Sequence, residues 1–119
     1  MIQEGQVVLF RFPQIDQTLG KLRPALVIRR LPGPYDDWLI CMISSQLSQQ
    51  ISGFDEIIAG EDIDFELSGL KTSSVIRISR LAVVNKNALL GSIGKISVER
   101  LNFIKYKISD WIKAHNNHS

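Results

Sequence analysis

Short apolar runs, separated by polar stretches that contain proline or glycine, dominate the chain up to residue 96. The runs are rich in β-branched and aromatic residues, which favour strands. They predict strands at residues 6–12, 23–29, 38–43, 54–58, 74–84 and 93–96. Pro24 must stand where the second strand begins, because proline has no N–H to donate to a ladder, so Arg23 is predicted at the rim of the sheet.

From residue 97 onward the apolar positions recur at helical spacing. Ser97 is a favourable N-cap, and the spacing predicts a helix from there to about residue 115. A turn with a short helical piece is expected before the last strand, at residues 85–91. The apolar stripe of the terminal helix, which we expect to pack on the sheet, consists of Val98, Leu101, Ile104, Ile108, Trp111 and Ile112.

Several short strands followed by one terminal helix predict a mainly β fold, a small closed or half-open β-barrel with the helix packed against it. The length of 119 residues suits one domain, and no internal repeat or linker is visible. We therefore interpret residues 1–119 as a single domain. With 45% hydrophobic and 22% charged residues, the chain has the composition of a globular protein.

The formal net charge of +2 neither demands nor excludes a polyanion as partner, so the placement of the basic residues must decide. The one cysteine, Cys41, lies within an apolar run and is predicted to be buried, with no disulfide partner in the chain. No basic leader precedes the first strand, and no apolar run approaches the roughly 18 residues of a membrane span. We expect a cytoplasmic protein without a membrane anchor.

Polar side chains stand at three places on the predicted strands. Arg23 lies at the start of one strand, and Ser44 directly follows another. Arg77 projects from the longest strand, on the same face as Ser79. Each place also has a purely structural interpretation: Arg23 as a solvated charge, Ser44 as a serine that bonds its own backbone, and Arg77 as half of an ion pair. The loop at residues 13–20 is a candidate binding loop.

Acidic residues are concentrated in one segment. Five of the 12 lie between Glu56 and Glu66, so the remaining surface is more basic than the net charge suggests. Asp62 and Asp64 suggest a metal site, but no histidine or further carboxylate pair accompanies them at ligand spacing. We therefore interpret this segment as a solvated acidic loop and expect no metal ion.

The sequence lacks the residues of several common catalytic sites. Both histidines, His115 and His118, lie in the terminal tail, so a Ser-His-Asp triad or a zinc site is not expected in the body of the fold. No glycine-rich phosphate loop opens a helix, and no cofactor is expected. Arginine, serine and carboxamide groups suit a phosphodiester, because guanidinium groups bind phosphate oxygens in pairs and stabilise added negative charge. RNA would supply its own nucleophile, the 2′-hydroxyl.

Five segments, in this order along the chain, resemble one known family. They are residues 4–10 (Glu-Gly-Gln-Val-Val-Leu-Phe), 21–28 (Lys-Leu-Arg-Pro-Ala-Leu-Val-Ile), 43–46 (Ile-Ser-Ser-Gln), 69–77 (Gly-Leu-Lys-Thr-Ser-Ser-Val-Ile-Arg) and 90–97 (Leu-Gly-Ser-Ile-Gly-Lys-Ile-Ser). The Arg-Pro-Ala-Leu-Val sequence at residues 23–27 is the most specific of them. In these residues the chain resembles the MazF/PemK family of toxins of type II toxin–antitoxin systems.

The resemblance implies an SH3-like barrel of the CcdB/MazF type and a homodimer whose cleft binds single-stranded RNA. Members of the family cleave RNA at short motifs without a metal ion and leave a cyclic phosphate. An antitoxin protein inhibits them by covering the same surface. The resemblance further implies that Arg23 is a catalytic arginine, that Ser44 stands where the family has threonine, and that Arg77 is an acid and phosphate clamp.

Three positions, in two parts of the chain, depart from the family pattern. Ser79 belongs to the implied catalytic set by position, but PemK-type members have an aspartate there, proposed as the base, and serine is a poor proton acceptor. Gln17 and Thr18 lie in the first loop, where relatives often have His or Glu. The residues expected to contact RNA are Gln17, Lys21, Arg29 and Gln46.

Two non-cleaving alternatives share the same barrel fold. The first is a toxin that binds a protein such as DNA gyrase, as the related CcdB toxins do through their C-terminal helix, where this chain has Trp111 but no clear match. The second is a module that binds RNA or an antitoxin but has lost its base at Ser79. For the nuclease interpretation, the expected partners are single-stranded mRNA and an acidic, partly disordered antitoxin.

Overall fold

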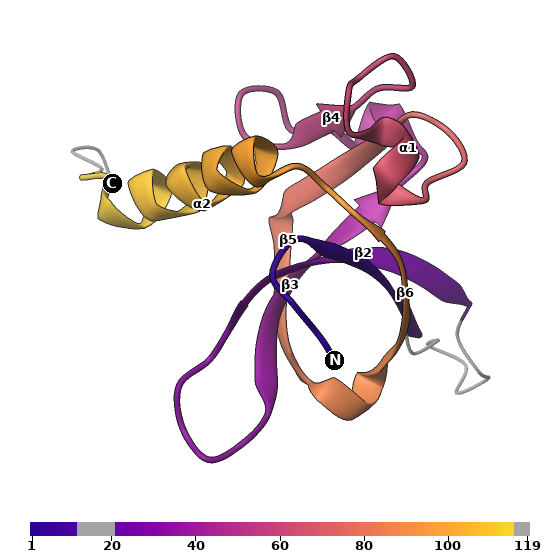
Figure 1. Cartoon of the computed structure of the whole chain (residues 1–119). Coiled ribbons are helices and arrows are strands. Elements are labelled where there is room, and N and C mark those ends of the chain that lie inside the picture. Colours follow the sequence, from indigo (N-terminus) through magenta and orange to yellow (C-terminus); the bar gives the residue numbers. More distant parts are fainter. Residues whose placement is uncertain (12–20, 116–119) are drawn as a thin grey trace.

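The computed structural model describes residues 1–11 and 21–115 of the chain (Figure 1). These residues form the strands β1 (Gln6–Arg11), β2 (Leu22–Arg30), β3 (Asp37–Ser44), β4 (Glu56–Ile58), β5 (Ser74–Asn85) and β6 (Leu89–Lys95). The helices are α1 (Phe65–Ser68) and α2 (Val98–Lys113), with short 3₁₀ turns at η1 (Leu47–Gln49) and η2 (Lys86–Ala88). The mainly β prediction with a C-terminal helix is therefore confirmed.

The strands form one antiparallel sheet in the order β4-β5-β3-β2-β1-β6. The edge strands β4 and β6 do not pair with each other, so the sheet is curved but open, the half-open form of the predicted barrel (Figure 1). The segment after α1 packs closely on β6, where a Cβ on Gly69 would lie 2.1 Å from the carbonyl oxygen of Ile93. Gly69 also has a φ of +75°, so both the close packing and the backbone require glycine there.

The observed strand bounds match most of the predicted ones. The prediction that Pro24 begins the second strand is wrong, because β2 starts at Leu22 and both Arg23 and Pro24 pair with β1. β6 begins at Leu89, four residues before the predicted start at residue 93. The short helical piece expected within residues 85–91 is η2 (Lys86–Ala88), and residue 12 and the loop at residues 13–20 lie outside the described residues. β6 was placed too late because its Gly91 and Ser92 interrupt the apolar pattern.

Both faces of the sheet carry buried side chains, as the alternation along each strand requires. One cluster includes residues of α2 and is formed by Val7, Leu26, Ile28, Cys41, Ile43, Ile58, Ile76, Ile78, Ile96, Leu101, Ile104 and Ile108. The other consists of Val8, Ala25, Val27, Trp38, Ile40 and Leu89. Cys41 is fully buried as predicted, and burial, with the charge of Asp55 nearby, raises the pKa of its thiol.

Helix α2 begins as predicted, because the Ser97 side chain accepts a hydrogen bond from the N–H of Arg100 at 3.1 Å. Only three of the six residues in the predicted apolar stripe are buried. Leu101, Ile104 and Ile108 are buried, but Val98, Trp111 and Ile112 are 69%, 61% and 67% exposed. The Trp111 ring lies 6.1 Å from the ring of Phe54, and Ile112 lines a groove with Ile28 and Leu39, so both lie at the edge of the core with most of their surface exposed. Neither helix in the described part of the chain is both long enough and apolar enough to cross a membrane.

Candidate functional site

A pocket of about 260 Å³ lies where β2, β3 and β5 meet the segment after β3. Its lining contains three guanidinium groups and, in the described residues, no carboxylate. We call it the cationic pocket; it is lined by Arg23, Met42, Ile43, Ser44, Ser45, Gln46, Gln49, Arg77 and Arg80. Three of the four predicted catalytic residues and one predicted RNA-binding residue therefore line one pocket: Arg23, Ser44, Arg77 and Gln46.

The register of the sheet explains why Arg23 and Arg77 converge. Ala25 of β2 pairs with Met42 of β3, and Met42 pairs with Arg77 of β5. Arg23 lies two residues before Ala25 and therefore on the same face of β2. The pairings thus place both arginines at one end of three adjacent strands, with β3 between them.

A bulge in β5 adds a third arginine, which the sequence reasoning missed. Arg77 pairs with Met42, but the next partner on β3, Cys41, pairs with Leu81, so three residues of β5 have no partner in the register. In a regular strand Arg77 and Arg80 would point to opposite faces, because they are three positions apart, an odd number. The bulge instead lets both line the cationic pocket. No sequence signal identifies this bulge, because no glycine or proline marks it.

Arg77 is half-buried, and no carboxylate in the described part of the chain pairs with its charge. Its Nη1 donates to Oε1 of Gln49 at 3.4 Å, and its buried Nε has no hydrogen-bond partner among the described residues. The interpretation of Arg77 as half of a structural ion pair is wrong, because no carboxylate within residues 1–11 and 21–115 pairs with it. A buried donor without an acceptor costs about 1–3 kcal/mol, so an anionic ligand in the pocket would relieve that cost.

The segment after β3 holds its polar groups in a short chain of hydrogen bonds. The Ser44 hydroxyl accepts from the N–H of Gln46 at 3.1 Å, as the structural interpretation of the serines predicts. Oε1 of Gln46 accepts from Nε2 of Gln49 at 3.1 Å, and Gln49 in turn accepts from Arg77. Gln49 was not predicted as a site residue; it reaches the pocket because η1 turns the chain back beside β5.

Ser79 lies outside the cationic pocket. It lines a neighbouring hollow of about 410 Å³ that shares Met42 and Arg80 with the pocket. Its hydroxyl donates to Oδ2 of Asp55 at 3.0 Å and its N–H donates to Oδ1 of the same carboxylate at 2.8 Å. Ser79 is therefore bonded to a carboxylate from another segment, at the position where PemK-type relatives have their own.

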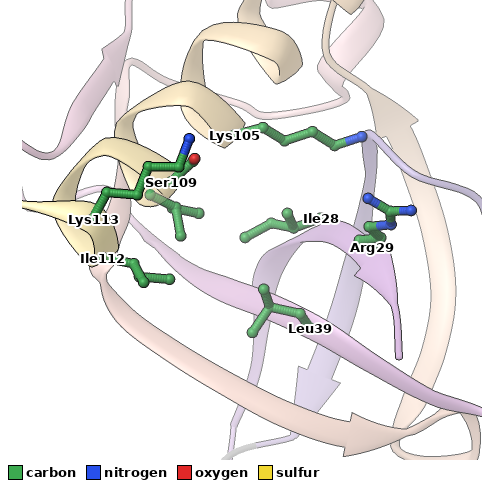
Figure 2. Close-up of a pocket in the computed structure, with 8 residues that line it drawn as sticks. Ile28, Arg29, Leu39, Lys105, Ser109, Ile112 and Lys113 are labelled. Carbon is green, nitrogen blue, oxygen red and sulfur yellow. The ribbon is translucent and has the colours of Figure 1, made fainter. Parts of the chain in front are cut away.

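The remaining predicted RNA-binding residues do not line the cationic pocket. Lys21 is exposed just before β2, and Gln17 lies outside the described residues. Arg29 stands at the far end of β2 from Arg23, about 20 Å along the strand at the usual rise per residue. It lines a separate groove of about 360 Å³ between β2, β3 and α2, whose other residues include Lys105 and Ile112 (Figure 2).

The acidic segment is a folded ion-pair cluster, which corrects the prediction of a solvated loop. Asp64 is 3% exposed and accepts from Nε of Arg100 at 2.9 Å and from the Ser97 N–H at 3.0 Å. Nη2 of Arg100 donates to Asp62 at 2.9 Å. Burial by itself raises the pKa of Asp64, but the hydrogen bonds from Arg100 and Ser97 outweigh it, and the pKa lies below its ordinary value. This segment binds α2 to the sheet.

Comparison with known proteins agrees with the architecture and with the resemblance of the five segments. The sequence profile of a family described as PemK-like, MazF-like toxin of type II toxin-antitoxin system matches residues 3–112. Among solved structures, the Mycobacterium tuberculosis toxin MazF-mt6 is similar with a TM-score of 0.63 and 15% sequence identity, over 93% of this chain and 99% of that one. No curated protein sequence is significantly similar to the chain. Because the family profile covers nearly the whole chain, the protein belongs to the PemK-like, MazF-like family of type II toxins.

Proposed function

We propose that this protein is an endoribonuclease that cleaves single-stranded RNA without a metal ion, by attack of the RNA 2′-hydroxyl on the adjacent phosphate. The observation that carries the proposal is the cationic pocket, in which Arg23, Arg77 and Arg80 share one lining that has no carboxylate in the described residues. Guanidinium groups match phosphate oxygens in geometry and charge. The proposal also agrees with membership of a family whose relatives act on RNA. Of the interpretations drawn from the sequence, the family match favours this one over the non-cleaving alternatives.

In the proposed reaction, Arg23 and Arg77 bind the non-bridging oxygens of the scissile phosphate. The 2′-oxygen forms a bond to phosphorus while the bond from phosphorus to the 5′-oxygen breaks, which leaves a 2′,3′-cyclic phosphate and a 5′-hydroxyl end. The phosphate gains negative charge on the way to the five-coordinate transition state, and the two guanidinium groups stabilise it there. Ser44 and Gln46 line the same pocket and are assigned hydrogen bonds to the RNA.

Proton transfer is the step that the pocket supports least. The lining in the described residues contains no carboxylate or imidazole. We therefore assign catalysis to charge stabilisation and positioning. The proton of the 2′-hydroxyl passes to a water molecule, and the 5′-oxygen of the leaving group takes a proton from another water molecule, so no net proton is gained or lost.

The direct test is to incubate the protein with a long single-stranded RNA in excess EDTA and to map the new ends. We expect cleavage at short recurring motifs with 2′,3′-cyclic phosphate ends. Arg23→Ala should abolish cleavage, whereas Arg29→Ala, which removes a guanidinium from the other end of the same strand, should cleave like the wild type. Intact RNA with the wild-type protein, or cleavage only after a divalent metal is added, would overturn the proposal.

The proposed partners follow from the family. We propose a cognate antitoxin with an acidic segment that covers the cationic pocket, a cytoplasmic location where mRNA is available, and a homodimer as the active form.

The exposed apolar side chains at the end of α2, Trp111 and Ile112, are the surface that we assign to subunit contact in the homodimer. Light scattering should give twice the mass of 13.4 kDa, and Ile112→Glu should shift it toward the monomer. A monomeric wild type would overturn the dimer.

A further inference from the structure

Asp55 is a buried carboxylate that lies outside the cationic pocket and has no assigned role. It is 2% exposed, and no cation in the described residues forms an ion pair with it. Its charge is instead met by three neutral donors: the N–H of Ser79 at 2.8 Å, the hydroxyl of Ser79 at 3.0 Å and the N–H of Ile51 at 2.9 Å. A carboxylate can accept all three hydrogen bonds because both of its oxygens are acceptors. An amide has one acceptor oxygen, and its N–H₂ group only donates.

Two of the three hydrogen bonds end on the bulge of β5. Ser79 is the middle of the three residues of β5 that have no partner on β3. The N–H and the hydroxyl of Ser79 both donate to the carboxylate of Asp55, so the middle of the bulge is bonded to this side chain. The bulge is what lets Arg77 and Arg80 line one pocket, so the contact with Asp55 fixes the backbone that sets the spacing of these two cations.

The third hydrogen bond ends on the segment that supplies Gln49. The N–H of Ile51, two residues after Gln49, donates to Asp55, and the backbone carbonyl of Asp55 accepts from the side chain of Gln50 at 3.3 Å. Gln49 in turn accepts from Arg77. One buried carboxylate thus binds both chain segments that contribute polar groups to this side of the pocket.

We propose that Asp55 is a positioning residue for the cationic pocket, holding the β5 bulge so that Arg80 and Arg77 face the same bound phosphate. This inference rests on the proposed function for its catalytic readout. Asp55 is not assigned contact with RNA, because both of its oxygens are already hydrogen-bonded and it does not line the pocket. Its effect on cleavage therefore passes through the arginines.

The test is a double-mutant cycle of Asp55→Asn with Arg80→Ala, read as kcat/KM for RNA cleavage per folded molecule. Asn presents an N–H₂ group to one of the three donors, so the bulge should loosen and cleavage should fall about tenfold. In the Arg80→Ala background, Asp55→Asn should cost less than about threefold, because the arginine that it positions is already absent. If Asp55→Asn lowers kcat/KM by the same factor with and without Arg80, so that the losses of the two single variants multiply in the double variant, the proposal is wrong.

Two further variants separate a loss of cleavage from a loss of folding. Asp64→Asn is the matched control, since Asp64 is also a buried carboxylate with three hydrogen bonds from its neighbours but lies in the Arg100 cluster. It should lower stability without changing cleavage per folded molecule. Ser79→Ala removes only the hydroxyl bond to Asp55 and replaces Asp55→Asn in the cycle if that variant does not fold. A control that loses as much cleavage as Asp55→Asn would show that Asp55 acts only on stability.

A readout that does not need activity separates this inference from the proposed function. If the wild type leaves RNA intact, the proposed function fails, and amide hydrogen exchange then tests Asp55 alone. The N–H groups of Ser79 and Arg80 should exchange at least tenfold faster in Asp55→Asn than in Asp64→Asn at matched stability. Equal exchange rates in the two variants would overturn the positioning role.

Discussion

Arg77 and Arg100 show two different uses of a buried arginine in one small protein. The side chain of Arg100 is 14% exposed and lies against three carboxylates, from Glu56, Asp62 and Asp64, at 3.5, 2.9 and 2.9 Å. Arg77 is half-buried, donates to the side chain of Gln49 and keeps a buried Nε without a partner among the described residues. The first guanidinium is neutralised within the fold, and the second is not.

The difference teaches how to tell a structural cation from a binding one. Arg100 joins α2 to the acidic segment before α1, and its charge is already compensated there. Around Arg77, the described residues that line the same pocket include Arg23 and Arg80 and no carboxylate. Because a compensated cation has little to gain from an external anion, the pocket is the place where RNA phosphate binds most favourably under our proposal.

The largest effect should come from removing the uncompensated cation. Arg77→Ala should lower kcat/KM for RNA cleavage by about 10³-fold, because it deletes a donor that stabilises transition-state charge. Its free energy of unfolding should change by less than about 1 kcal/mol, since no ion pair with a described residue is lost. Steady-state cleavage and urea unfolding measure the two effects. Full cleavage activity in this variant would contradict the assignment of Arg77 as the cation that binds RNA.

The compensated arginine should show the opposite behaviour. Arg100→Ala leaves three carboxylates without their cation, so the free energy of unfolding should fall by about 3 kcal/mol. Urea unfolding measures the loss. Cleavage by the fraction that remains folded should equal that of the wild type, and a selective loss of cleavage would contradict the division between the two arginines.

A smaller effect is expected at the rim of the pocket. Arg80 is exposed and joins the pocket through the bulge, so Arg80→Ala should reduce kcat/KM about tenfold. The reduction should grow weaker at high salt, because an exposed cation acts through a screened interaction. Lys71→Ala, which removes an exposed cation elsewhere, is the control and should cleave normally at every salt concentration.

The smallest effect is a pH dependence within the Arg100 cluster. The pKa of Asp64 is lowered from its ordinary value of 3.8, so its charged form stabilises the folded state above that pH and loses this role as pH falls through the lowered pKa. The difference in unfolding free energy between the wild type and Asp64→Asn should be constant from about pH 5 to 7 and shrink below pH 3.8. A difference that grows on acidification would contradict the sign.

The sequence predicted the parts of the site that depend on strand order and strand ends. Arg77 could be placed on a long strand by alternation. Arg23 was expected just before a strand that Pro24 begins, but β2 starts at Leu22 and pairs Arg23 with Phe10, so Arg23 lies within the strand, one residue from its start. Both then meet because β2, β3 and β5 are adjacent. Their proposed catalytic roles, like that of Ser44, remain predictions.

The parts that sequence reasoning missed depend on contacts between distant segments. Arg80 joins the site only because a bulge breaks the alternation, and Asp55 meets Ser79 across 24 positions of the chain. Asp64 looked like a member of a solvated acidic loop because its partner, Arg100, lies 36 positions away. Trp111 continues the helical stripe in sequence, but it is 61% exposed and lies beside Phe54 at the edge of the core. A local pattern carries no information on any of these contacts.

The most direct test of the central claim is a crystal structure of the protein with an RNA oligonucleotide that carries a 2′-deoxy sugar at the mapped cleavage site. Such an RNA binds without being cleaved, because the nucleophile is missing. We expect the phosphate that follows this sugar to lie within hydrogen-bond distance of both Arg23 and Arg77. A phosphate bound instead in the groove beside Arg29, or at the Arg100 cluster with the cationic pocket empty, would contradict it.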